Sequence, residues 1–474
     1  MYDFESRARG AAGGSDRVTP GRRRSGEAMR ISVLALAAAA ATCGFAGPAT
    51  GAGGSVESSA GGIECISLAL HPCPQPYDAR LPRAEDMLSW DPHSRVIGFR
   101  NAYRLYKGDV FRTLQSMPYP LPSAPDMLPT VRYRLDGRTF GVEDYLRRQN
   151  VTGLLIVKDG RIAYEHYARG NTPTTLWTSR SVAKSVVSIL VGMAIKEGSI
   201  GSVSDPISRY LPELRGGAWE GVTLRELLQH VSGVAWNENY ADPTSDFAQM
   251  TRCEAGTEPY DCVMHLVRSV KRKDGVEPGS VWSYNTGGAW LVGQLLERAT
   301  GMTLAKYLES RLWSRFGMQS DGVWQALVPD KADMGGHGFN ATLRDWGRFG
   351  LFVADGGTLA SGEELLPANW LAQSTTWTKA KDSVTPQSPD GQYGYQWWFI
   401  GADPARPGAS EVNETARQAF WAVGIYGQAI AINRAEHLVV VQWSTWKQAS
   451  GPAAMYDEQA FFVDAVTRAL HRTE

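Results

Sequence analysis

Several features that would assign a function at once are missing from this sequence of 474 residues. No G-x-S-x-G occurs, so the nucleophile turn of α/β-hydrolases is absent. The 8 histidines never fall at H-x-x-x-H or a similar spacing, and we expect neither a metal nor a cofactor. The formal net charge is −1, which gives no reason to expect nucleic acid or an anionic membrane as a partner. A content of 43% hydrophobic and 20% charged residues is ordinary for a globular protein.

Cysteine is also scarce, with 5 in the whole chain. Removal of an N-terminal signal would take away Cys43 and leave an even number in two close pairs. We predict disulfides Cys65–Cys73 and Cys253–Cys262, each closing a short loop in an oxidising compartment. Free buried thiols are the alternative.

No apolar run near the N-terminus is long enough to cross a membrane. Residues 31–41 follow Met29-Arg30 and have the length of the apolar region of a signal peptide. We therefore interpret residues 1–52 as a disordered start plus a signal peptide at about 29–52, with lipid attachment at Cys43 as the alternative. The protein is expected to be periplasmic or secreted, with no integral membrane segment after signal removal.

The most informative stretch is Ser181-Val182-Ala183-Lys184, at the start of a helical run that is apolar on nearly every side. Such a helix should be buried, and a lysine in its first turn needs a reason because a buried ammonium is costly. Positions i and i+3 share one helix face, so Lys184 can reach the Ser181 hydroxyl. A hydroxyl beside an amine of lowered pKa is the arrangement of an activated nucleophile.

Two further patterns bear on this pair. A second S-x-x-K, at residues 444–447, follows a strand and opens no helix, so we interpret it as accidental. The loop at 278–288 carries Tyr284 in an aromatic-rich turn before a helix. An isolated tyrosine is more often packing, but beside a Ser–Lys pair it is a candidate to protonate the leaving group and later activate water.

The organisation of the chain is read from periodicity and turn signals. Residues 53–128 predict an irregular N-terminal arm with one helix near 94–106. Strands are predicted at 151–158 and 161–166 around Asp159-Gly160, and again at 420–424, 428–433 and 438–443. Helices and loops are predicted between about 200 and 390, and a closing helix at 457–471. The fold class is α/β (α+β): an antiparallel sheet completed by the C-terminus, flanked by helices, with an inserted mostly helical domain.

The motifs together resemble serine hydrolases of the β-lactamase and penicillin-binding-protein superfamily, class C-like. The closer likeness is to 6-aminohexanoate-dimer hydrolases and related serine esterases. The superfamily resemblance is carried by residues 181–185, 227–233, 278–288, 335–348 and 393–398, and the closer likeness is carried by residues 177–185 and 239–243. The resemblance implies a hydrolase domain at 129–474, with Ser181 as the acyl nucleophile, Lys184 as its base and Tyr284 as the proton shuttle.

Two departures from the family pattern bear on the substrate. The Tyr-x-Asn element reads Tyr284-Asn285-Thr286, so the amide that β-lactamases aim at the substrate is absent. The element that supplies a cation for a substrate carboxylate reads Gly424-Ile425-Tyr426-Gly427-Gln428, without a cation. A β-lactam or D-Ala-D-Ala carboxylate would lose a charge-assisted partner worth about 1.5–3 kcal/mol.

We therefore expect hydrolysis of small-molecule carboxylic esters or linear amides. A β-lactamase or D-alanyl peptidase is the first alternative, and an inactive binding protein on the same fold is the second. The expected oxyanion and substrate-binding residues, with Gln428 or its neighbour as the second oxyanion donor, are Gln428, Tyr426, Gly427, Thr286, Asn340, Trp397 and Trp398. Tyr426, Trp397, Trp398 and Trp236 would form an apolar cleft; packing in the core is the alternative.

Overall fold

The computed structural model describes residues 68–114, 117–376, 378–379, 392–401 and 417–471, all within one compact unit. The segment predicted to be a signal peptide, Cys43 and Cys65 lie outside these residues. Within the described part of the chain, no helix is both long and apolar enough to span a bilayer.

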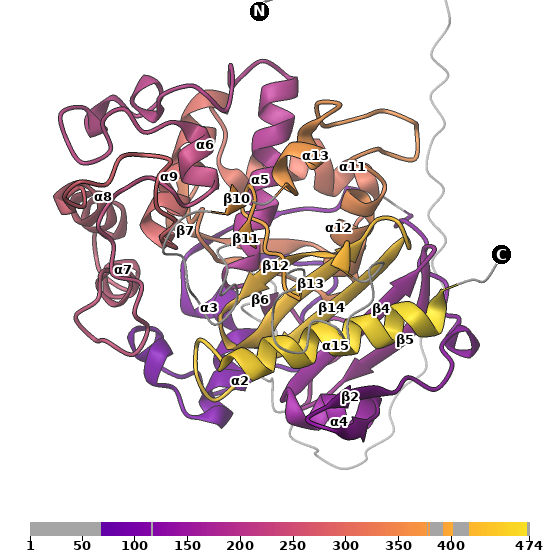
Figure 1. The fold of residues 1–474 in the computed structure, drawn as a ribbon. Coiled ribbons are helices and arrows are strands. Elements are labelled where there is room, and N and C mark those ends of the chain that lie inside the picture. The colour runs from indigo at the N-terminus through magenta and orange to yellow at the C-terminus, as the bar shows by residue number, and fades with distance from the viewer. Residues whose placement is uncertain (1–67, 115–116, 377, 380–391, 402–416, 472–474) are drawn as a thin grey trace, which may run out of the picture. The chain divides into compact units, whose positions relative to one another are not determined.

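The main sheet runs in the order β12-β13-β14-β4-β5, with every neighbouring pair antiparallel (Figure 1). Its strands come from two distant parts of the chain: β4 (Val151–Lys158), β5 (Arg161–Tyr167), β12 (Phe420–Gly424), β13 (Gln428–Asn433) and β14 (Leu438–Ser444). The expected antiparallel sheet, completed by the C-terminus, is confirmed.

The period-2 alternation of these strands divides the interior into two hydrophobic clusters. Leu155 and Val157 pack with the helices on one face, while Leu154 and Ile156 pack with α15 (Ala453–Leu470) on the other. Successive side chains of a strand point to opposite faces, so a strand buried on both faces reads as a continuous apolar run. In Figure 1 the yellow helix α15 lies across one face of the sheet. The closing helix was predicted to begin at residue 457 and begins one turn earlier.

The opposite face of the sheet is covered by helices from the middle of the chain. The 15-residue helix α5 (Val182–Lys196) is buried from Val182 to Ala194, as its all-round apolar sequence predicts. Around it lie α6 (Leu224–Leu228), α9 (Thr286–Thr300), α10 (Leu304–Leu308), α12 (Leu343–Ala354) and α13 (Trp370–Ser374), while α7 (Asp246–Glu254) and α8 (Pro259–Ser269) lie farther out. A π-helical turn at Glu309–Trp313 joins α10 to α11 (Ser314–Phe316), so residues 304–316 form three short helical pieces.

The region predicted as helices and loops also contains strands. A second sheet runs β1-β7-β9-β6, with β8 (Ala332–Asp333) paired to β7 (Gly322–Val328). Both faces of β7 are buried, so its sequence lacks the alternation by which a half-exposed strand is recognised. Strand β6 (Trp177–Thr178) pairs with β9 (Phe339–Ala341) and leads into α5.

The N-terminal arm contributes to this second sheet, because β1 (Gly108–Phe111) pairs with β7. A 3₁₀ helix at Ala84–Ser89 precedes α2 (Pro92–Arg100), which Asp91 caps by accepting hydrogen bonds from the backbone N–H groups of His93 and Ser94. The single helix expected near 94–106 is in fact α2 and α3 (Ala102–Leu105), since the backbone leaves helical geometry at Asn101.

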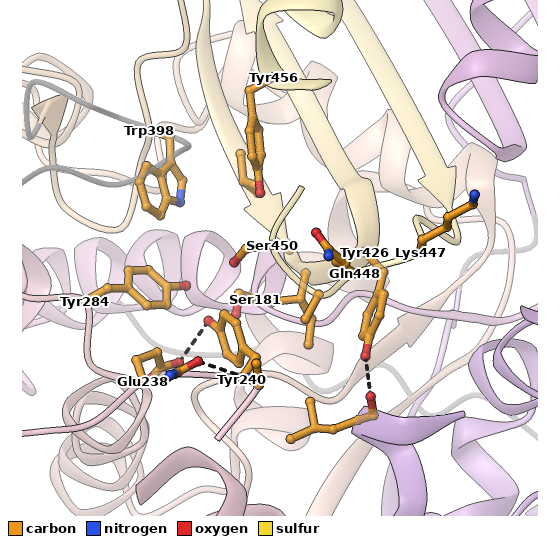
Figure 2. A pocket seen from close by; sticks show the side chains of 17 residues that line it. Ser181, Glu238, Tyr240, Tyr284, Trp398, Tyr426, Lys447, Gln448, Ser450 and Tyr456 are labelled. Carbon is orange, nitrogen blue, oxygen red and sulfur yellow. Dashed lines mark hydrogen bonds between the residues drawn. The ribbon is translucent and has the colours of Figure 1, made fainter. Parts of the chain in front are cut away.

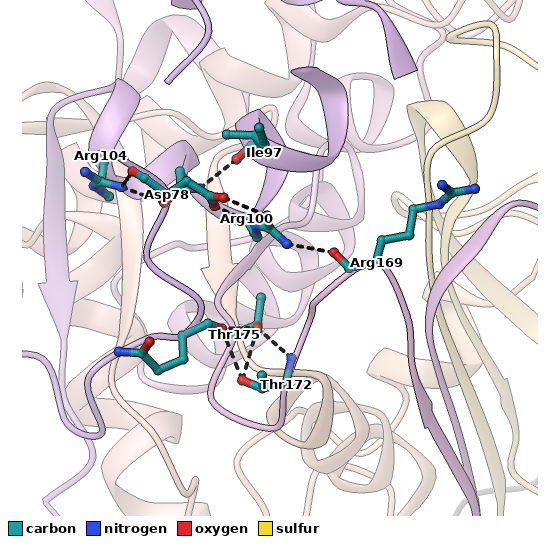
Figure 3. Close-up of polar contacts among 9 residues, drawn as sticks. Asp78, Ile97, Arg100, Arg104, Arg169, Thr172 and Thr175 are labelled. Atoms are coloured by element: carbon teal, nitrogen blue, oxygen red, sulfur yellow. Dashed lines mark hydrogen bonds and ion pairs between the residues drawn. The ribbon is translucent and has the colours of Figure 1, made fainter. Parts of the chain in front are cut away.

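Polar side chains tie the arm together and to the sheet (Figure 3). The Asp78 carboxylate accepts two hydrogen bonds from the Arg100 guanidinium, at 2.6 and 2.7 Å, and one from the Asn101 amide. Arg100 also donates to the carbonyl of Arg169, which follows β5, at 2.8 Å. Arg104 donates to the Asp78 carbonyl. These hydrogen bonds therefore hold the arm in a fixed position against the rest of the protein.

Candidate active site

Ser181 lies where the chain passes from β6 into the buried helix α5. The residue before it, Arg180, has a positive φ of 47°, and this turn sets Ser181 at the helix N-cap position. Its side chain makes no capping hydrogen bond to the helix backbone. The hydroxyl is therefore available to other partners, and it faces a cavity.

Lys184 is buried one turn further along α5, with 1% of its surface exposed. Its Nζ lies 3.0 Å from Ser181 Oγ, 3.1 Å from Thr286 Oγ1 and 2.7 Å from the Gly336 carbonyl oxygen. Burial lowers the pKa of Lys184 to about 7, and the carboxylates of Glu238 and Glu254 oppose that shift. A lysine with this pKa is substantially neutral at physiological pH, as a base must be.

Tyr284 closes the third side of the site. Its ring centroid is 5.0 Å from Lys184 Nζ, and its hydroxyl points toward Ser181 (Figure 2). The ring is held in an aromatic group, with the His230 ring centroid at 4.5 Å and that of Trp398 at 5.4 Å. Burial and the Glu238 charge raise the pKa of Tyr284, while a hydrogen bond with the Ser181 hydroxyl lowers it.

These groups open onto a cavity of about 510 Å³ (Figure 2). It is bounded by the Ser181 turn, the loop at 238–241, the end of β12, the loop at 447–450, the start of α15 and the N-terminal arm. The lining residues are Leu88, Ser181, Glu238, Asn239, Tyr240, Ala241, Tyr284, Trp398, Val423, Gly424, Ile425, Tyr426, Lys447, Gln448, Ala449, Ser450 and Tyr456.

Of the residues expected to bind substrate, Tyr426 and Trp398 line this cavity. Thr286 does not, but it contacts Lys184 from behind. Trp397 is wrong as a cleft residue, because its ring packs at 5.0 Å against Phe420 with no exposed surface. Asn340 is also wrong: its side-chain amide donates to the carbonyls of Val323 and Gly338 inside the second sheet.

Gln428 and Gly427 do not line the cavity either. The Gln428 side chain is used inside the sheet, where Oε1 accepts from the Trp177 indole at 2.8 Å and Nε2 donates to the Ser444 carbonyl. Trp236, the further candidate for the cleft, turns its indole N–H toward Glu238 instead.

The strand end that meets the nucleophile is Gly424, four residues before Gln428. A Cβ on Gly424 would lie 2.6 Å from the Ser179 carbonyl oxygen and 3.1 Å from the Ser181 nitrogen, so only glycine permits this approach. Ile425 follows and lines the cavity. The residue that β12 places beside the Ser181 amide is therefore Gly424, and the expected donor Gln428 lies farther along the chain.

Sequence reasoning missed several lining residues. Glu238 precedes the Asn239-Tyr240 segment that carried the family likeness, yet its carboxylate is the acidic group in the cavity lining (Figure 2). Lys447 belongs to the S-x-x-K interpreted as accidental; it lines the cavity, but its amine points away from Ser181 in Figure 2. Leu88 comes from the arm, and no local pattern signals it.

The Cys253–Cys262 disulfide is confirmed, with an S–S distance of 2.03 Å. Cys73 is also disulfide-bonded, while Cys65 lies outside the described residues. Next to Cys253, the buried Glu254 carboxylate lies 3.1 Å from His337 Nε2. His337 follows Gly336, whose carbonyl accepts from Lys184, so this pair sits behind the site and does not edge the cleft. In the described ranges, no group of three or more His, Cys, Asp or Glu is placed to hold a metal ion.

Comparison with known proteins gives a consistent assignment. A profile of the family described as Beta-lactamase matches residues 142–464. The 6-aminohexanoate-dimer hydrolase of Paenarthrobacter ureafaciens is 27% identical over 328 residues, 66% of this chain and 78% of that protein. A beta-lactamase of Pseudomonas fluorescens is 24% identical over 187 residues, 38% of this chain and 48% of that protein.

The fold is also found among solved structures. A Bacillus anthracis structure, provisionally described as a 6-aminohexanoate-dimer hydrolase, superposes with a TM-score of 0.69 at 20% identity, covering 83% of this chain and 98% of that one. The family match contains Ser181, Lys184 and Tyr284, whereas Leu88 lies before it.

Proposed function

The chain belongs to the beta-lactamase family of serine hydrolases, and from this premise we propose that it hydrolyses carboxylic esters or linear amides through an acyl-enzyme on Ser181. Lys184 is the base and Tyr284 the proton shuttle. The observation that carries the proposal is the distance of 3.0 Å between Lys184 Nζ and Ser181 Oγ, at a lysine whose pKa burial lowers to about 7.

Acylation begins when the Ser181 hydroxyl gives its proton to the neutral Lys184 amine as Oγ bonds to the substrate carbonyl carbon. The bond to the leaving group then breaks, and the leaving oxygen or nitrogen takes the Tyr284 proton. The enzyme now holds an acyl-Ser181, a Lys184 ammonium and a Tyr284 phenolate. These opposite charges form together at a ring-to-nitrogen distance of 5.0 Å, so neither is left isolated.

Deacylation runs through the same two groups. A water molecule gives a proton to the Tyr284 phenolate, which is a strong base because burial raises the pKa of Tyr284. The resulting hydroxide attacks the acyl carbon, and the departing Ser181 Oγ recovers its proton from Lys184. Each group ends as it began, and the products are a carboxylic acid and an alcohol or amine.

The negative charge that develops on the substrate carbonyl oxygen must be stabilised by hydrogen-bond donors that are already in position. We propose the backbone N–H groups of Ser181 and Ile425, because Ser181 is the N-cap residue of α5 and Ile425 follows the glycine that packs on the Ser181 nitrogen. The N-terminus of α5 adds the positive end of a helix dipole to this position.

The cavity favours uncharged acyl chains. Aromatic rings of Tyr240, Trp398, Tyr426 and Tyr456 form much of its wall. Thr286 replaces the family amide, and residues 424–428 offer no cation to a substrate carboxylate. The name of the Paenarthrobacter relative denotes hydrolysis of 6-aminohexanoate dimer, a linear amide, which is consistent with this choice.

We also propose that the protein is exported to the periplasm or beyond. The Cys253–Cys262 bridge and the bridge at Cys73 support this, because disulfides persist in oxidising compartments. Fractionation of cells that express the full chain should find oxidised, active protein outside the cytoplasm. Active protein that stays cytoplasmic with free thiols would contradict export.

The function is tested with purified protein and a substrate panel. Short-chain p-nitrophenyl esters should be hydrolysed clearly and nitrocefin little or not at all, with 6-aminohexanoate dimer as the linear amide. A fluorophosphonate probe should label Ser181. A nitrocefin kcat/KM that matches or exceeds that for p-nitrophenyl acetate would restore the β-lactamase alternative, and absence of labelling would favour the inactive binding protein.

A further inference from the structure

The Glu238 carboxylate accepts four hydrogen bonds, which is more than a residue that only lines the cavity needs. Its Oε1 accepts from the Thr286 hydroxyl at 2.5 Å and from the Tyr240 hydroxyl at 3.0 Å. Its Oε2 accepts from the Thr286 backbone N–H at 3.0 Å and from the Trp236 indole N–H. Both oxygens are thus fully used by groups around Lys184 and the cavity.

These bonds fix the direction of every hydrogen around Lys184. The Thr286 hydroxyl has one hydrogen, and a carboxylate oxygen at 2.5 Å can only accept it. Thr286 Oγ1 must then accept from Lys184 Nζ, 3.1 Å away, as the Gly336 carbonyl also must at 2.7 Å. A neutral amine has two hydrogens, and both are now committed.

The one remaining direction at Nζ is the lone pair, and the remaining neighbour is Ser181 Oγ at 3.0 Å. The hydrogen bond between them can therefore run only from the serine hydroxyl to the amine. If Thr286 were free to rotate its hydrogen toward Nζ, it would compete for that lone pair, and the amine would lose its fixed orientation.

We propose that Glu238, acting through Thr286, is a positioning residue that forces neutral Lys184 to accept the Ser181 proton. The proposal rests on the function proposed above for Ser181 and Lys184. Glu238 makes no bond to either residue, so its effect is carried by the Thr286 hydroxyl.

Charge acts in the same direction as geometry. Glu238 and Glu254 raise the pKa of Lys184 against the effect of burial, so the ammonium that forms during acylation is stabilised by Glu238. The other titratable groups facing Lys184 are Tyr284 and His230; burial raises the pKa of Tyr284 and lowers that of His230 well below its usual value. Both shifts favour the neutral form of the group, which leaves Lys184 as the group that gains and loses charge beside the two carboxylates.

The experiment compares Thr286→Val with Thr286→Ser. Valine keeps the shape of threonine but has no hydroxyl, whereas serine keeps the hydroxyl and lacks the methyl group. A loss of activity in the valine variant that the serine variant does not show is therefore due to the hydroxyl and not to packing. Thr286→Val should lower kcat for p-nitrophenyl acetate by about tenfold or more with KM little changed, and Thr286→Ser should stay within about threefold of wild type. Equal activity of the two variants would overturn the proposal.

Glu238→Gln tests the charge. An amide at this place must turn its NH₂ toward donors on one side, so it cannot accept all four hydrogen bonds. The rate should fall by about tenfold, and the acid limb of the kcat/KM profile should move to lower pH by about half a unit, because the Lys184 pKa loses a supporting charge. Asp242→Asn, a half-buried carboxylate in the same loop that does not line the cavity, is the matched control and should change neither quantity.

Two outcomes separate this proposal from the function on which it depends. If the fluorophosphonate probe does not label Ser181 in the wild type, the proposed function itself is wrong. If it labels the wild type and Glu238→Gln at the same rate and with the same pH dependence, the function stands and the positioning role of Glu238 is wrong.

Discussion

The proposed catalytic centre and the N-terminal arm are built in different ways. Ser181 and Lys184 belong to a helix buried in the part of the chain that matches the family, and their polar atoms bond to one another and to neighbouring elements. The arm lies before that match and is held by contacts such as the Asp78–Arg100 ion pair (Figure 3). Yet the arm supplies Leu88 to the same cavity.

This difference predicts that one part of the molecule carries out the reaction and that the other part selects the substrate. The groups proposed to transfer protons belong to a buried hydrogen-bond network in which the loss of one hydrogen bond disturbs the others. The arm touches the cavity through one apolar side chain and through Tyr426, whose hydroxyl donates to the Leu88 carbonyl at 3.2 Å. Changes in the arm should therefore alter which substrates fit and leave the reaction intact.

The largest expected effect is in the centre. Ser181→Ala should lower kcat by about a thousandfold or more and abolish fluorophosphonate labelling, because nucleophile and base act as one unit. Lys184→Ala should cost about as much, and the two losses should not add. Thermal unfolding should show that Ser181→Ala is folded, since the serine makes no helix-capping bond. Substantial esterase activity in Ser181→Ala would contradict the assignment of Ser181 as the nucleophile.

The pH profile is the next test of the centre. Below a pKa of about 7, Lys184 becomes charged and cannot accept a proton, so kcat/KM should fall about tenfold per pH unit on the acid side. The pKa of Tyr284 is raised, so no loss is expected on the alkaline side up to about pH 9. The measurement is kcat/KM for p-nitrophenyl acetate from pH 5 to 9, corrected for spontaneous hydrolysis. A profile flat down to pH 5 would contradict Lys184 as the base.

Local patterns predicted the elements that build this centre. Strands β4, β12 and β13 have the predicted bounds, because bounded apolar runs identify strands that are buried on both faces. The contact of Ser181 with Lys184 follows from helix geometry over three residues, and it could be predicted because no distant part of the chain is needed to make it.

What the sequence did not reveal depends on contacts between distant residues. Glu238 meets Thr286 across 48 positions, and Leu88 meets Tyr426 across 338. Gln428 was chosen by counting along a motif, whereas Tyr426 has a φ of 62° and turns the chain, so the residue beside Ser181 is Gly424. A positive φ at a residue other than glycine is difficult to recognise from the sequence, because the residue type does not indicate it.

An intermediate effect is expected at the disulfide, which belongs to neither region but lies behind the centre. Cys253→Ser with Cys262→Ser opens a bridge across a separation of 9 residues and should lower the free energy of unfolding by about 2–3 kcal/mol. Glu254 follows Cys253 and contacts His337, so kcat should fall only a few-fold while the site stays assembled. Chemical denaturation of both proteins in oxidising buffer measures the difference. Equal stability of the two proteins would show that packing alone stabilises this segment and that the disulfide adds nothing to it.

The smallest effect is expected in the arm, and it is an effect on choice of substrate. Leu88 is held through Tyr426: the tyrosine hydroxyl donates to the Leu88 carbonyl, and the Arg95 guanidinium, which donates to the Trp446 carbonyl, lies 4.3 Å from the centre of the Tyr426 ring. Leu88→Ala should enlarge the cavity without moving Ser181.

The rate for p-nitrophenyl hexanoate relative to acetate should then rise by about fivefold, with the acetate rate itself within about twofold of wild type. Leu105→Ala is the matched control, since Leu105 is also a half-buried arm leucine but does not line the cavity. If Leu88→Ala lowers both rates equally, the arm serves the fold alone. If both leucine variants shift the ratio alike, the arm acts on the cavity as a whole, and the division between chemistry and selectivity would not rest on Leu88.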